Sequence, residues 1–80
     1  MKHITVEDCR NLKKKFEKYC ETAEQHEFVM LLITQFNMDE TIKQIEKDGE
    51  VKNQKDVRAM FRVVLSLIGE DKSEYEEEED

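Results

Sequence analysis

The chain contains no proline, no tryptophan and only two glycines among its 80 residues. β-sandwiches and barrels need many turn residues, so this composition argues against them and favours helices joined by short loops. A chain of this length also builds only one small core, because it buries about 60% of the surface that the unfolded chain exposes. We therefore do not expect an enzyme with a deep cleft.

Cysteines and long hydrophobic runs are also scarce. Cys9 and Cys20 would lie roughly 16 Å apart if both were on one helix, too far for a disulfide, so we expect reduced thiols in the core. The longest apolar run, Phe28–Ile33, is too short to span a membrane, and the N-terminus has no signal-peptide pattern. These features predict a cytoplasmic protein without a membrane span.

The negative charge is unevenly distributed along the chain. The formal net charge is −7, yet residues 1–69 hold 12 basic and 12 acidic residues, whereas residues 70–80 hold one basic and eight acidic residues. Tyr75 is the only large apolar residue in this last segment. Such a segment buries too little surface to offset the entropy lost on ordering. We predict one helical domain over residues 1–69 and a disordered acidic tail over residues 70–80.

Two helix-start signals lie in the first half of the chain. Thr5 and Asp8 have the spacing of a capping box, and the helix after them places apolar residues on one face and basic residues on the other. Thr22 and Gln25 predict a second helix after a bend, although one continuous long helix is an alternative. The predicted buried face of this second helix consists of Phe28, Val29, Leu32, Ile33 and Phe36, with Met30 and Leu31 on its flanks.

Two further helices are predicted in the second half. Asn37 is a candidate cap for a short third helix that ends at Asp48 and Gly49. Asn53 is a candidate cap for a fourth helix that ends at Gly69 and carries Arg58, Arg62 and Ser66 opposite its apolar face. The predicted fold class is all-α: a compact bundle of three to four short helices with a disordered acidic C-terminal tail.

No residue pattern predicts catalysis. The only histidines are His3 and His26, and neither is expected to activate a nucleophile. The cysteines and histidines match no zinc-binding spacing. We therefore expect no enzymatic activity, no cofactor, no metal and no small-molecule substrate.

The apolar residues exceed what a small bundle of this length covers, which predicts a protein-protein interaction module whose partner is another protein, a second copy in a homodimer, or both. We expect a small regulatory, accessory or inhibitor protein that occludes a partner's surface. In general style, though in no motif, it resembles short virus-encoded accessory and inhibitor proteins that act on host or phage proteins. The predicted binding residues are four apolar contacts and three basic residues aligned on the first helix: Phe28, Met30, Leu31, Val63, Arg10, Lys14 and Lys18.

A nucleic-acid role is the alternative. The acidic tail could imitate DNA, and the last two helices could form a helix-turn-helix. The connection from Asp48 to Asn53 is longer than the three to four residues usual in that motif, and the neutral body lacks a basic footprint. A further hypothesis is intramolecular: the tail could fold over the basic side of the first helix.

Overall fold

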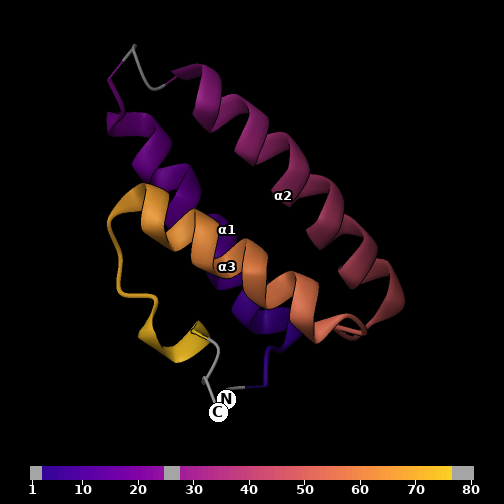
Figure 1. Cartoon of the computed structure of the whole chain (residues 1–80). Helices are drawn as coiled ribbons and strands as arrows, with labels where there is room; N and C mark the ends of the chain where they lie inside the picture. The colour runs from indigo at the N-terminus through magenta and orange to yellow at the C-terminus, as the bar shows by residue number, and fades with distance from the viewer. Residues whose placement is uncertain (1–2, 25–27, 77–80) are drawn as a thin grey trace.

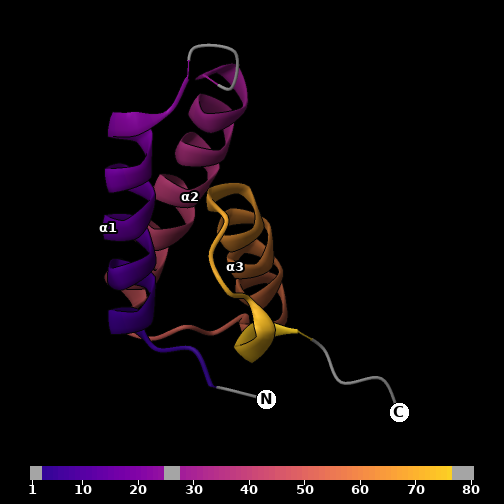
Figure 2. The ribbon, with the colours of Figure 1, turned by 90° about the vertical axis from the view of Figure 1, so that its left-hand side faces the viewer.

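A computed structural model describes residues 3–24 and 28–76 and contains three α-helices, α1 (Val6–Thr22), α2 (Phe28–Asp48) and α3 (Gln54–Ile68), followed by a short 3₁₀ helix, η2 (Ser73–Tyr75). No strand occurs within these residues, so the all-α class is confirmed. α1 packs closely against both α2 and α3, whereas α2 and α3 approach each other less closely (Figures 1 and 2).

The start of α1 is the predicted capping box. The Asp8 amide donates to Thr5 Oγ1 at 3.1 Å, and the Thr5 amide donates to Asp8 Oδ2 at 3.0 Å. The helix ends at Thr22, and Ala23 has extended backbone angles. α1 and α2 are therefore separate helices, and the alternative of one continuous helix is wrong. The second predicted cap, at Thr22–Gln25, extends into residues 25–27, outside the described part of the chain.

The predicted second and third helices are one helix. α2 runs for 21 residues without a break, and Asn37 lies inside it, where its carbonyl accepts a hydrogen bond from Thr41 Oγ1 at 2.9 Å. The prediction that Asn37 caps a separate helix is thus wrong. Continuity aligns four buried side chains in one stripe, and their burial outweighs the preference of Asn for a cap. The stripe consists of Leu31, Met38, Ile42 and Ile45.

The predicted buried face of α2 is also wrong. Phe28, Val29, Leu32, Ile33 and Phe36 are all exposed, and of the apolar residues in 28–36 only Leu31 is buried. The first half of α2 is apolar around its whole circumference, so its own pattern does not determine which side faces the core. The second half determines this, because Met38, Ile42 and Ile45 are its only large apolar residues.

α3 has the predicted boundaries. Asn53 Oδ1 accepts from the Asp56 amide at 3.4 Å at the start. At the end, Gly69 adopts a left-handed conformation (φ 76°), and the Glu70 amide donates to the Leu65 carbonyl at 2.9 Å, as in a Schellman motif. One prediction for this helix is wrong: Arg58, expected on the polar face, is only 9% exposed.

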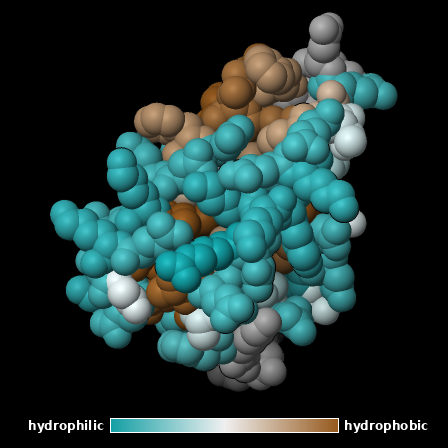
Figure 3. Space-filling model, turned by 180° about the vertical axis from the view of Figure 1, so that it is seen from behind, coloured by the Kyte–Doolittle hydropathy of each residue, from teal (hydrophilic) through white to brown (hydrophobic). Residues whose placement is uncertain are grey.

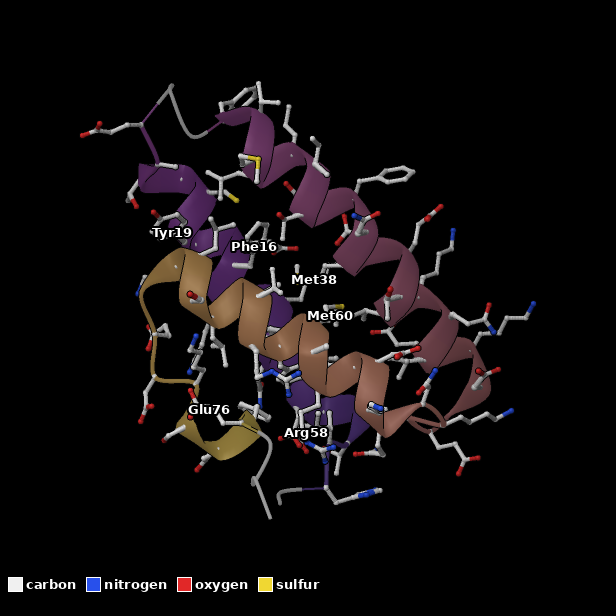
Figure 4. All side chains as sticks on the ribbon, in the orientation of Figure 1. Phe16, Tyr19, Met38, Arg58, Met60 and Glu76 are labelled. Atoms are coloured by element: carbon white, nitrogen blue, oxygen red, sulfur yellow. The ribbon has the colours of Figure 1, made fainter. Side chains whose placement is uncertain are left out.

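The core lies where α1 faces the other two helices. Phe16, Met38 and Phe61, one from each helix, are almost fully buried, and Figure 4 shows Phe16 and Met38 pointing into the space between the helices. Ile4, ahead of α1, is also fully buried. Cys9 belongs to this core, as predicted, whereas Cys20 is only half-buried, and both thiols are free.

The acidic tail differs from the predicted disordered segment over residues 70–76. η2 places Tyr75 against α3, where its ring centroid lies 4.8 Å from that of Phe61, and the Tyr75 side chain is buried. Arg62 Nη1 donates to the Tyr75 carbonyl at 2.9 Å. One aromatic side chain thus anchors a segment whose composition predicts disorder. Residues 77–80 lie outside the described part of the chain.

Candidate protein-interaction surface

The N-terminal half of α2 carries a large apolar surface. We call it the α2 apolar face, and it consists of Phe28, Val29, Met30, Leu32, Ile33 and Phe36, which are between 48% and 66% exposed. Figure 3 shows these apolar side chains gathered at the top of the molecule, where α2 begins, above a mostly hydrophilic remainder of that view.

Helical geometry explains why this face is free. At about 100° per residue, its centre lies roughly opposite the buried stripe that contains Leu31 and Met38. Phe28 and Phe36 lie two turns apart, about 12 Å along the axis. The six partly exposed side chains present on the order of 600 Å² of apolar surface, at the upper end of what monomeric proteins expose.

The structure separates the predicted apolar contacts into two groups. More than half of the surface is exposed in each of three predicted contacts, so these side chains are accessible to a partner: Phe28, Met30 and Val63. Leu31 is 3% exposed because it points into the core, so it is not available to a partner, contrary to the prediction. Met30 and Val63 line one shallow depression of about 380 Å³ between α2 and α3, together with Thr34, Arg62, Ser66, Leu67 and Lys72.

Four exposed residues were missed as candidate contacts because the pattern assigned them to the core: Val29, Leu32, Ile33 and Phe36. The sequence does contain a signal for them. An apolar helix segment without a polar side can bury only one side in a three-helix structure, so its other side must be exposed or bound.

The three predicted basic residues do not form one open patch. Arg10 Nε donates to Glu46 Oε1 at 3.3 Å on the side of α2. Lys14 lines a hollow of about 440 Å³ together with Asp71 and Glu74 of the tail. Lys18 lines another, with Glu70. The start of the tail therefore lies near Lys14 and Lys18 of α1, and whether it screens them, as the intramolecular hypothesis holds, stays a prediction.

A second surface feature is the groove between the C-terminal half of α2 and the N-terminal half of α3. It measures about 550 Å³ and contains the apolar residues Ile45, Val57 and Met60 beside acidic residues. Two of its carboxylates already accept local hydrogen bonds. Asp48 Oδ1 accepts from Gln44 Nε2 at 3.1 Å, and Asp56 Oδ2 accepts from Nδ2 of Asn53, the cap of α3, at 2.6 Å. The groove is open, with no buried charged group at its centre.

The thiols are poor nucleophiles. Burial, and to a lesser extent Asp8 and Glu46, raise the pKa of the Cys9 thiol from 9.0 to about 11, and burial together with Glu17 raises the pKa of Cys20. A raised pKa keeps a thiol protonated at neutral pH, and the thiolate is the reactive form. His3 is exposed, and His26 lies outside the described residues.

Residues 3–24 and 28–76 contain no group of three or more His, Cys, Asp or Glu side chains placed to hold a metal ion. None of the helices described is both long and apolar enough to cross a membrane. Comparison with known protein families, curated proteins and solved structures found no match to this chain.

Proposed function

We propose that this chain is a non-enzymatic protein-interaction module that binds through the α2 apolar face. The observation that carries the proposal is the exposure of six large apolar side chains on the solvent side of one helix. Burial of apolar surface gains about 25 cal/mol per Å², so covering this face is strongly favourable. Phe28 and Phe36 are the aromatic anchors, a residue type that is enriched at protein interfaces.

The shape of the face suggests how it binds. A single straight helix with anchors two turns apart is convex, and such a surface fits an apolar groove or pairs with another helix. It requires no pocket of its own. The module therefore acts as a small regulatory, accessory or inhibitor protein, which changes its partner by covering part of the partner's surface.

The nucleic-acid alternative has less support. In the predicted recognition helix, Arg58 is buried and Arg62 donates to the Tyr75 carbonyl, so neither is directed freely toward a phosphate. Gln54, at the start of the same helix, is bonded to the backbone of Ile4. We therefore retain protein binding as the proposal.

Affinity capture from cells of the source organism tests the proposal. Ile33→Glu places a charge in the middle of the face, at a residue that is exposed and not needed for the core. Lys43→Glu is the control, since Lys43 is exposed on the same helix beyond the face. We expect a partner protein that the wild type and Lys43→Glu recover and Ile33→Glu loses. Equal recovery by all three would overturn the proposal.

A further inference from the structure

We infer that a second copy of this chain covers the α2 apolar face, with the two α2 helices antiparallel across a two-fold axis beside Leu32. This inference rests on the proposed function, because it names the protein that the face binds. Three observations lead to it: the symmetry of the face, the charges that follow it, and its area.

The face is symmetric along the helix. Phe28, Leu32 and Phe36 are spaced by four residues, so a phenylalanine lies one turn away from Leu32 in either direction. All three are exposed. A two-fold interface joins one patch to itself, so each residue must find a suitable counterpart in the same patch. In an antiparallel pair centred on Leu32, Phe28 meets the second copy's Phe36, and Leu32 meets its own equivalent.

The charges beyond the face favour the antiparallel orientation. Glu40, Lys43 and Lys47 are exposed and continue along the same side of α2 after Phe36. In a parallel pair each of them would face its equivalent, and like charges opposed across an interface are unfavourable. In the antiparallel pair, residues past Phe36 extend beyond the second copy's Phe28, where α2 begins, so these like charges do not oppose one another.

The area fits a dimer. A standard stable interface buries about 800 Å² on each partner, and the apolar face supplies on the order of 600 Å² of this before its flanking residues are counted. Pairing also gives the first half of α2 a core on both sides, which is the usual position of a helix that is apolar around its circumference. Small domains commonly complete their cores in this way.

Light scattering behind a size-exclusion column tests the association. We expect the wild type, at micromolar concentration, to have twice the 9.6 kDa mass of one chain. Leu32→Glu should halve this mass and keep the helical circular dichroism spectrum, because Leu32 lies outside the core. Lys43→Ala should remain dimeric. A monomeric wild type at hundreds of micromolar would overturn the inference.

Engineered cysteines test the orientation. In a background with Cys9→Ala and Cys20→Ser, a mild oxidant should cross-link Leu32→Cys to its own equivalent in the second copy. Mixed chains should cross-link Phe28→Cys to Phe36→Cys faster than either forms a disulfide with itself. Faster self-linkage of Phe28→Cys would indicate a parallel pair and overturn the inference.

The two proposals fail in different ways. A monomeric chain from which Ile33→Glu removes a captured protein overturns the dimer and leaves the proposed function standing. If the chain is a dimer and captures no other protein, the inference is supported and the proposed function is restricted to self-association. A dimer whose mass and captured proteins are unchanged by both Leu32→Glu and Ile33→Glu overturns both.

Discussion

The side-chain amide of Gln54 forms two hydrogen bonds with the backbone of Ile4, one as acceptor and one as donor. Its Oε1 accepts from the Ile4 amide at 2.8 Å, and its Nε2 donates to the Ile4 carbonyl at 2.8 Å. The same Nε2 donates to the Val51 carbonyl at 3.1 Å. One amide therefore joins the segment before α1 to the loop before α3, and it holds the fully buried Ile4 in the core.

Gln54→Ala should reduce the free energy of unfolding by about 1–3 kcal/mol, because it leaves partly buried backbone groups of Ile4 without partners. Urea denaturation followed by circular dichroism measures this. Gln44→Ala is the matched control, since the Gln44 side chain donates an exposed hydrogen bond to Asp48, and we expect a change within about 0.5 kcal/mol. Equal effects of the two substitutions would contradict the assigned role of Gln54.

Leu31 and Leu32 are neighbours with opposite environments, 3% and 48% exposed. Leu31→Ala should cost about 2–4 kcal/mol of stability, as in other core truncations. Leu32→Ala should cost less than about 1 kcal/mol when measured on the dissociated chain, at low protein concentration. If the two costs were equal or reversed, the observed orientation of α2 would be wrong.

The start of α1 and both ends of α3 were predictable from the sequence because their causes are local. The Thr5 and Asp8 box, the Asn53 cap and the left-handed Gly69 each depend on residues within one turn. The orientation of α2 was not predictable from residues 28–36, because every side of that segment is apolar. It depends on Met38 and Ile42, which follow that segment in the same helix, and on where α1 packs. For the same reason, the sequence did not distinguish the exposed Phe28 and Met30 from the buried Leu31.

Tyr75→Ala should lower stability by about 2 kcal/mol, because it removes a buried ring that packs on Phe61. Tyr75→Phe keeps the ring and should cost less. Thermal unfolding compares the two variants. A loss for Tyr75→Phe as large as that for Tyr75→Ala would show that the ring contact is not what anchors the tail.

Release of the tail should also uncover positive charge. Tyr75→Ala leaves the net charge at neutral pH unchanged, but it frees Asp71 and Glu74 from their place beside Lys14 and Lys15. We expect stronger binding to vesicles that contain anionic lipid at low salt, and loss of that gain at high salt. Co-sedimentation measures it, with neutral vesicles as the control. Unchanged binding would show that the tail does not screen these lysines.

The Cys9 thiol makes stability depend on pH in the alkaline range. Its pKa is about 11 in the folded chain against 9.0 ordinarily, so the folded state holds the proton more tightly. The stabilisation is fully present below pH 9 and is lost as the pH rises from 9 to 11. The stability difference between the wild type and Cys9→Ala should therefore narrow over this interval. A constant difference would contradict the raised pKa.

The acidic tail shows that composition alone does not determine whether a segment is ordered. The count of acidic residues after Gly69 predicts disorder, but composition does not record that Tyr75 is placed to reach Phe61 once Gly69 reverses the chain. The contact spans 14 positions and needs a formed α3. The basic side of α1 was likewise predictable from the sequence. That Arg10 pairs with Glu46, whereas Lys14 lies beside the tail, depends on how three segments pack.

The uncovered side of α2 has a consequence for solubility. Phe28–Ile33 is a run of six apolar residues without charge, proline or glycine, which is also the composition of segments that stack into cross-β fibrils. In the helix the carbonyl groups of this run accept hydrogen bonds from amides further along α2, and the run is not extended, so it does not act as a strand. Any change that unwinds the start of α2 should therefore promote aggregation as well as loss of binding, and amyloid-dye fluorescence would detect it.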